Sequence, residues 1–171
     1  MTERRIYDDE LYAHFVTFSC YKRRKLLGPN LAKRIVTSTL GTRLTKHNAK
    51  CIGFVVMPDH VHVMIWFDQP NQLSLFMNKW KDQSSAQVKR LFQRTLPSNW
   101  SKVGNDDAVW QARYYPFHVY SEQKLQEKLD YMHMNPVTRG LVEKTCDRPW
   151  SSARFYLEGK SVGVPISMPD I

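Results

Sequence analysis

The sequence predicts an α+β fold in which one antiparallel sheet carries helices packed on one of its faces. Strand-like apolar runs and amphipathic helices follow in the order strand, helix, strand, strand, helix, strand, with one further helix after them. Without that last helix the order is βαββαβ, the ferredoxin-like arrangement. The turn signal Pro58-Asp59 is short enough to make the strands on either side of it antiparallel neighbours. The second face of the sheet is then free for a substrate or for added elements.

Four predicted elements fill the first half of the chain. The run His14–Cys20 is apolar on both faces, which is typical of a central strand. Gly28-Pro29-Asn30 opens a helix whose apolar residues recur at helical spacing to about His47. A second strand, Cys51–Met57, has no polar side chain, and His60–Phe67 follows it as the hairpin partner.

The second half supplies two helices and one strand. A helix from about Gln72 to Phe92 has one apolar face, made of Leu73, Phe76, Met77, Trp80, Ser84, Val88 and Leu91. A fourth strand is expected around Tyr115–Tyr120, and Ser121 is a good N-cap for the helix after it. We expect this helix to end at about Met134, because the residue before Pro136 is pushed out of the α region.

Composition indicates one domain over residues 1–171, in which residues after about 140 form a C-terminal extension. The formal net charge is +9 and the pI is near 9.6. Such a surface attracts polyanions, so nucleic acid is the leading partner class and a membrane surface the second. A basic protein with no polyanionic partner is the alternative.

No apolar stretch approaches the roughly 20 residues that would span a bilayer, so we expect no membrane insertion. The N-terminus, MTERR, leads into polar sequence, which predicts no signal peptide. Cys20, Cys51 and Cys146 lie far apart and form no CxxC pair. They are interpreted as reduced thiols, which favours a cytoplasmic location.

A pair of histidines stands on the predicted strand after the turn. His60 and His62 project from the same face because strand side chains alternate, whereas Val61 and Val63 project from the other. Two adjacent imidazoles on a rigid strand can hold a divalent metal. Two partly exposed histidines with no ligand fit the pattern equally well, and a metal site needs a third ligand.

The last predicted helix offers that third ligand and a nucleophile. Tyr131 and Asn135 are four residues apart, so they lie on one helix face. An amide oxygen suits Mg²⁺ or Mn²⁺, and a tyrosine beside it can act as a nucleophile. Spacing alone does not single out Tyr131, because the chain has eight tyrosines, Tyr114 and Tyr115 among them.

Four motifs, in order, resemble one enzyme family. The run MPDHVH over Met57–His62 resembles the histidine-hydrophobe-histidine (HUH) motif of the single-tyrosine transposases. DYMHMNPV over Asp130–Val137 is similar to the nucleophile helix of their REP-associated branch. WQARY over Trp110–Tyr114 and RPWSS over Arg148–Ser152 are similar to that branch as well. The pair of histidines alone is a weak signal, whereas the ordered set is highly specific.

The resemblance implies a transposase that cleaves and rejoins single-stranded DNA beside a hairpin. Tyr131 would be the catalytic nucleophile and would form a 5′-phosphotyrosine bond. His60, His62 and Asn135 would hold a divalent metal, Mg²⁺ or Mn²⁺, although many relatives use glutamine or a carboxylate in place of the asparagine. His133 is expected to be a half-buried helix histidine and not a ligand.

Seven basic residues are the candidates for DNA binding, because phosphate contacts supply position and affinity. They are Arg4, Arg5, Lys22, Arg23, Arg24, Lys25 and Arg113. A solvated turn is the alternative for the run from Lys22 to Lys25. Tyr7, Tyr21 and Trp110 are candidates for stacking on unpaired bases.

Two rival functions remain open at this point. One is a binding module for hairpin DNA or RNA whose catalytic residues are vestigial, and the other is a different metallohydrolase that uses the histidine pair. The resemblance favours a monomer over a dimer, with Tyr131 acting in cis, in association with the bacterial nucleoid.

Overall fold

The computed structural model describes residues 12–95 and 108–169, and these contain a four-stranded sheet with the order β2-β3-β1-β4. Its strands are β1 (Ala13–Ser19), β2 (Ala49–Val56), β3 (His60–Phe67) and β4 (Tyr115–Val119). All three neighbouring pairs are antiparallel. The predicted ferredoxin-like arrangement is confirmed, and β1 is central as its two apolar faces predicted.

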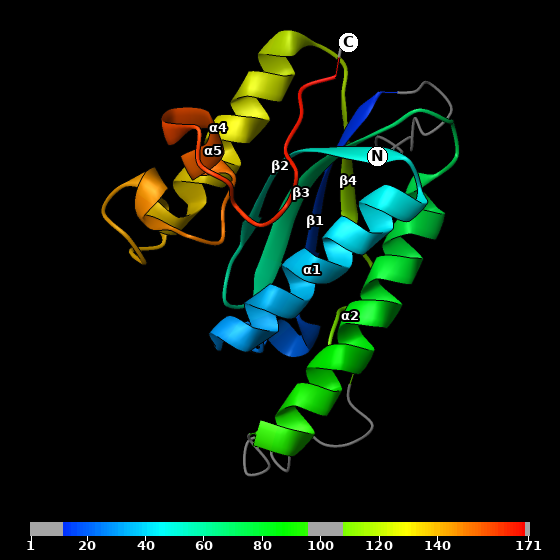
Figure 1. Cartoon of the computed structure of the whole chain (residues 1–171), viewed down its shortest axis with the longest axis vertical. Coiled ribbons are helices and arrows are strands. Elements are labelled where there is room, and N and C mark those ends of the chain that lie inside the picture. Colours follow the sequence, from blue (N-terminus) through cyan, green and yellow to red (C-terminus); the bar gives the residue numbers. More distant parts are fainter. Residues whose placement is uncertain (1–11, 96–107, 170–171) are drawn as a thin grey trace, which may run out of the picture.

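Two long helices, α1 (Asn30–Lys46) and α2 (Leu73–Thr95), cover one face of the sheet, where they run side by side (Figure 1). The larger core lies between them and the sheet, and Val61 and Val63 of β3 belong to it. Trp80 of α2 is fully buried there, and its indole N–H donates to the Val36 carbonyl of α1 at 3.2 Å. Burial of this large aromatic ring with its polar atom satisfied fixes α2 against α1.

The other face carries α4 (Glu122–Thr138) and α5 (Ala153–Glu158), which lie together away from α1 and α2 in Figure 1. A smaller core forms beneath α4. Leu129 and Met132 pack there against β2 at Gly53, where a Cβ atom would lie only 2.6 Å from Leu129 Cδ2. The absence of a side chain at this position therefore sets how closely α4 approaches the sheet.

The helix α4 begins as predicted and ends later than predicted. Ser121 is its N-cap, and the Ser121 side chain accepts a hydrogen bond from the Lys124 amide at 3.1 Å. The expected stop before Pro136 is wrong, because the helix continues to Thr138. Pro136 removes one amide donor, but its carbonyl accepts from Leu141, and Gly140 ends the helix at a φ of 73°.

The RPWSS motif attaches the C-terminal segment to β2. The Val56 carbonyl accepts from the Arg148 guanidinium at 2.6 Å, and the Val56 amide donates to the Trp150 carbonyl at 2.8 Å. Ser152 bonds to Phe54 through both its amide and its hydroxyl. Further on, the segment drawn in red runs beside β2 (Figure 1), where the Ser167 amide donates to the Cys51 carbonyl.

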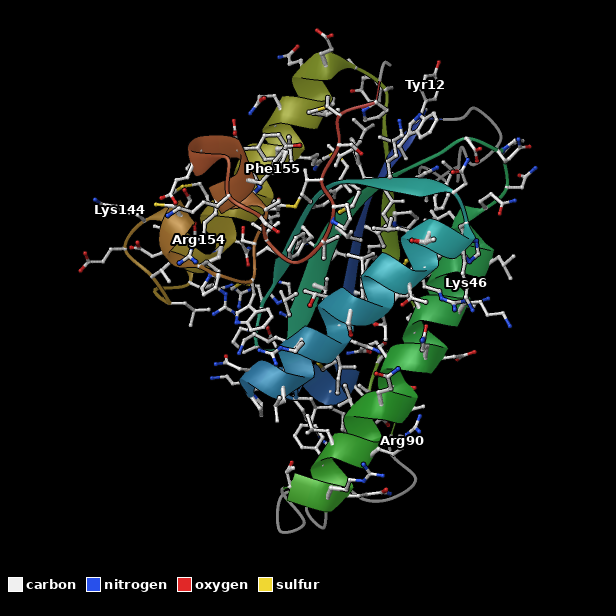
Figure 2. All side chains as sticks on the ribbon, viewed as in Figure 1. Tyr12, Lys46, Arg90, Lys144, Arg154 and Phe155 are labelled. Carbon is white, nitrogen blue, oxygen red and sulfur yellow. The ribbon has the colours of Figure 1, made fainter. Side chains whose placement is uncertain are left out.

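The outer surfaces of α1 and α2 are basic and exposed. Figure 2 shows Lys46 at the end of α1 and Arg90 on α2, each directed away from the sheet.

Trp110, expected to stack on DNA bases, instead belongs to the larger core, where its indole N–H donates to Ser84 at 2.9 Å. Among the described helices, none is long and apolar enough to cross a membrane.

Candidate active site

Strand β3 directs two histidines toward the α4 face of the sheet. His60 and His62 are 2% and 4% exposed, and their ring centroids lie 4.8 Å apart. The intervening Val61 points into the core under α1 and α2, as the alternation of strand side chains predicted. The pair is thus buried on a central strand, not partly exposed on a polar surface.

Each ring has one nitrogen held by a neighbouring side chain. His60 Nδ1 donates to the Asp59 carboxylate at 2.7 Å, because a carboxylate can only accept. His62 Nδ1 lies 2.8 Å from the Thr17 hydroxyl oxygen of the adjacent strand. His60 donates through Nδ1 and therefore keeps a lone pair on Nε2. His62 keeps a lone pair on Nε2 in the tautomer that donates from Nδ1 to the Thr17 oxygen, and in that form both Nε2 atoms can act as ligands.

Asn135 meets the histidine pair from α4. Its Oδ1 lies 3.2 Å from His60 Nε2 although the two residues are 75 positions apart in the chain. The side chain is 6% exposed, and the helix delivers it because α4 continues past this residue through Pro136. The structure therefore brings together the three side chains that the resemblance named as ligands.

The three side chains fit a small divalent cation. His62 Nε2 is buried and has no hydrogen-bond partner among the described residues. His62 shares its sheet face with His60, whose Nε2 contacts Asn135 Oδ1 of α4. The 3.2 Å between the last two acceptor atoms is close to the spacing of about 3 Å between adjacent ligands of Mg²⁺. The described residues hold no cluster of three histidine, cysteine or carboxylate side chains that could bind a metal instead.

Burial keeps the imidazoles uncharged. It lowers the pKa of His62 to about 3, and the neighbouring His60 and the cations around the site act in the same direction. Burial lowers the pKa of His60 as well, although Asp59 opposes the shift. For Asp59, burial raises the pKa but the hydrogen bond from His60 and the charge of Arg23 outweigh it, so the pKa is lowered. Two neutral imidazoles at pH 7 are the form that binds a metal.

Tyr131 stands at the mouth of this site. The side chain is 54% exposed, and its ring centroid lies 5.5 Å from that of His62 in an edge-to-face contact. Phe15 supports both rings, because it stacks on His62 at 5.5 Å and contacts Tyr131 at 6.2 Å. An accessible hydroxyl-bearing ring thus lies directly over the buried histidines.

The other basic candidates are placed around β1 and β4. Arg23 donates to Ser19 at 2.7 Å and pairs with Asp59 at 3.3 Å, which connects it to His60. Lys22, Arg24 and Lys25 share its turn, and Arg113 precedes β4. Arg4 and Arg5, like Tyr7, lie outside the described residues.

Three supporting residues were not singled out from the sequence. Asp59 was interpreted only as a turn residue, and Thr17 only as part of a strand, although its spacing in an antiparallel pair places it opposite His62. Lys128 lies one turn before Tyr131 and places its Nζ 4.3 Å from the Phe117 ring centroid and 5.3 Å from that of Phe15. Its spacing from Tyr131 on one helix face was the available signal.

His133 bonds to Ser152 at 2.7 Å and does not contact the proposed ligands.

Comparison with known proteins agrees with this geometry. The family model described as "Transposase IS200 like" matches residues 8–135, a range that contains both histidines, Tyr131 and Asn135. A Haemophilus influenzae protein assigned to the REP-associated tyrosine transposases is 25% identical over 107 residues, which are 59% of this chain and 57% of that protein. The REP-associated tyrosine transposase of Escherichia coli is 25% identical over 100 residues, 58% of this chain and 52% of that protein.

The chain thus spans about half the length of these curated relatives. A solved structure of a REP-associated tyrosine transposase bound to a REP hairpin superposes with a TM-score of 0.72. The match is 19% identical and covers 100% of this chain and 95% of that one, so it shows a shared fold. The resemblance predicted from the four motifs is confirmed by these matches.

Proposed function

We propose that this chain, which belongs to the IS200-like transposase family, cleaves and rejoins single-stranded DNA beside a hairpin through a covalent bond to Tyr131. The relation to a protein solved with a REP hairpin supports a palindromic repeat as the DNA that is bound. Such a protein would work in the cytoplasm, at the bacterial nucleoid.

One observation carries the proposal: an exposed tyrosine lies against a buried histidine pair on the same face of the sheet. A structural tyrosine would bury its ring, and an isolated histidine pair would have no nucleophile beside it. Here the Tyr131 hydroxyl is accessible to a DNA strand, while the ring is held edge-on by Phe15 and His62. The arrangement suits a nucleophile that attacks a phosphate bound next to it.

In the cleavage step the Tyr131 oxygen attacks the phosphorus atom in line. The new bond joins Oη to phosphorus as the hydroxyl gives its proton to the surrounding water. The bond from phosphorus to the 3′ oxygen breaks, and that oxygen takes up a proton from water and leaves as a 3′-hydroxyl. Rejoining reverses the step, because the phosphotyrosine bond conserves the energy of the original linkage. His60, His62 and Asn135 would hold Mg²⁺ or Mn²⁺, which when bound neutralises charge on the scissile phosphate.

We infer a monomer in which Tyr131 acts in cis, because the proposed ligands and the proposed nucleophile can meet within one chain. His60 and Asn135 are in contact, and Tyr131 lies one helical turn before Asn135. No second copy is needed to complete the set. Lys22, Arg23, Arg24, Lys25 and Arg113, together with Arg4 and Arg5, would contact DNA phosphates around it.

The test is the covalent adduct. Tyr131→Phe removes the attacking oxygen and keeps the ring contacts with Phe15 and His62, so we expect no denaturant-resistant adduct with a labelled hairpin that carries single-stranded flanks. Hairpin affinity should be unchanged. Tyr120→Phe is the matched control, because Tyr120 is also exposed, at 59%, and does not contact the histidine pair.

An adduct of normal yield with Tyr131→Phe would overturn the assignment of the nucleophile. Retention of the hairpin with no adduct from the unmodified chain, in the presence of Mg²⁺ or Mn²⁺, would favour the rival function of a binding module with a vestigial site.

A further inference from the structure

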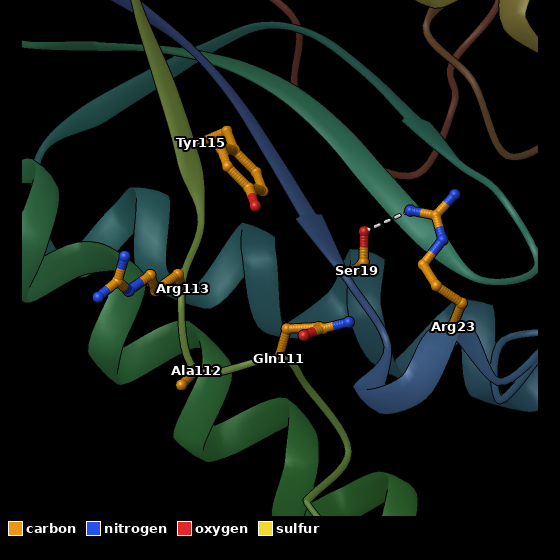
Figure 3. A pocket seen from close by; sticks show the side chains of 6 residues that line it. All are labelled: Ser19, Arg23, Gln111, Ala112, Arg113 and Tyr115. Atoms are coloured by element: carbon orange, nitrogen blue, oxygen red, sulfur yellow. Dashed lines mark hydrogen bonds between the residues drawn. The ribbon is translucent and has the colours of Figure 1, made fainter. Parts of the chain in front are cut away.

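A cavity of about 410 Å³ opens beside the candidate active site, between the end of β1 and the segment that leads into β4. Its lining is mostly polar or cationic: Ser19, Arg23, Gln111, Ala112, Arg113 and Tyr115. Figure 3 shows the Tyr115 ring between Arg113 on one side and Ser19 with Arg23 on the other. We call this cavity the β1–β4 pocket.

Strand register places the pocket on the same face as the histidines. Tyr115 is opposite Thr17 on β1, and Thr17 is opposite His62 on β3. Ser19, at the other side of the pocket, is opposite His60. Residues directly opposite each other in a sheet share a face, and neighbouring strands are about 4.8 Å apart. The pocket therefore begins one to two strand spacings, about 5–10 Å, from the histidine pair.

The lining suits one nucleotide better than a bare anion or an apolar ligand. Tyr115 is 59% exposed and offers a ring face on which a base can stack. Arg113 and Arg23 are cations at opposite ends of the pocket and can contact phosphate oxygens. Gln111 and Ser19 add polar groups for a base edge. An exposed aromatic ring beside cationic side chains is the combination that proteins use to bind single-stranded nucleic acid.

Arg23 connects the pocket to the metal ligands. Two adjacent non-glycine residues, Lys22 and Arg23, have φ angles of 54° and 55°, a conformation that costs free energy at each residue. The strained turn is held because Arg23 bonds to Ser19 and to Asp59, and Asp59 accepts from His60. The same guanidinium therefore faces the pocket and contacts the carboxylate that orients His60.

We propose that the β1–β4 pocket binds one unpaired nucleotide of the DNA strand that enters the active site, with its base stacked on Tyr115 and its phosphate on Arg113. This inference rests on the proposed function, since it concerns the same DNA strand. It assigns separate tasks to two residues of one pocket: Tyr115 recognises the base and Arg113 recognises the backbone.

The roles of Tyr115 and Arg113 can be separated by measuring the affinity of two variants for two DNA probes. All proteins carry Tyr131→Phe, so no probe is cut, and binding is followed by fluorescence anisotropy at constant salt. One probe is a ten-nucleotide strand of thymidines, and the other is the same length of abasic backbone. Tyr115→Ala should weaken binding of the thymidine strand about tenfold and leave the abasic strand unchanged. Arg113→Gln should weaken both probes by the same factor.

Tyr120→Ala, a change of another exposed tyrosine that does not line the pocket, should alter neither affinity. The proposal is overturned if Tyr115→Ala leaves both affinities unchanged or lowers both equally. Because the assay measures binding without cleavage, a missing covalent adduct in the earlier experiment would not change this result, and failure here would not affect the role of Tyr131.

Discussion

At the scale of single residues, Asp59 and Thr17 determine which nitrogens of the histidine pair are available. Each contacts a Nδ1 atom, which leaves both Nε2 atoms on the side of Asn135 and Tyr131. The orientation of the rings is therefore built into the folded chain before any cation binds. Outer contacts of this kind usually contribute about 10- to 100-fold to metal affinity.

His62→Ala tests whether the pair serves chemistry or structure. The change removes a proposed ligand and the ring beneath Tyr131, so we expect adduct formation to fall at least 100-fold while hairpin affinity changes less than about threefold. Calorimetric titration with Mn²⁺ should show weakened binding, a readout that does not depend on activity. His47→Ala, at the end of α1, is the control that should keep both properties. Equal losses of cleavage and of hairpin binding would indicate a structural role for His62.

At the scale of elements, the approach of α4 to β2 sets the positions of Tyr131, the proposed nucleophile, and of Asn135, the proposed third ligand. Gly53→Ala would place a Cβ 2.6 Å from Leu129 Cδ2 and 3.1 Å from Ser152 Oγ, and both of these side chains are buried. We expect a loss of about 1–3 kcal/mol in the free energy of unfolding, measured by urea denaturation. Asn135 should also move away from His60, which would lower the affinity for Mn²⁺.

Gly41→Ala is the matched control for that change, because the Cβ added in α1 would have no described atom within 4 Å apart from its chain neighbours and the backbone of the helix itself. It should stabilise the chain by about 0.5–1 kcal/mol, since alanine is the better helix former. If Gly53→Ala unfolds at the same urea concentration as the unmodified chain, the close packing of α4 on β2 does not limit stability.

The order and type of elements could be predicted because periodicity, turn residues and caps act locally. The hairpin at Pro58-Asp59 and the N-cap at Ser121 are of this kind. The extension of α4 past Pro136 could not be predicted from the sequence, because it depends on the tertiary packing of that helical turn. Asn135 and Pro136 are buried there. The contact of Arg23 with Asp59 depends on two positive φ angles that no residue type there predicts. The alternation of side chains along a strand predicted that His60 and His62 share a face. Tyr131 was singled out only by the resemblance to the single-tyrosine transposases.

At the scale of the whole molecule, buried histidines make stability depend on pH. Burial, and after it the charge of His118, lowers the pKa of His14 to about 4. The unfolded chain then binds a proton at His14 between about pH 6.5 and 4, whereas the folded chain does not. Stability is therefore fully present above pH 6.5 and is lost as the pH falls through this window, by about 1.4 kcal/mol per pH unit for this one group.

Urea unfolding between pH 7.5 and 4.5 measures this dependence. His14→Gln removes the imidazole at this one position and keeps the other buried histidines, so the stability of the variant should fall less steeply with falling pH than that of the unmodified chain. Identical slopes for the two proteins would show that His14 is protonated in the folded state or already shifted in the unfolded one.

The histidine pair and Tyr131 stand on elements that the sheet holds to different degrees. The histidines stand on β3, which is hydrogen-bonded along both edges. Tyr131 stands on α4, which follows β4, a five-residue strand that within residues 12–95 and 108–169 is bonded along one edge only. Strands with fewer ladder bonds open first in local unfolding. Fluctuations that release β4 and α4 would thus move Tyr131, the proposed nucleophile, away from the histidine pair while the pair keeps its geometry. In hydrogen exchange, amides of β4 should exchange before those of β3. The proposed site would then lose and regain its geometry through movement of Tyr131, while the histidine pair stays in place.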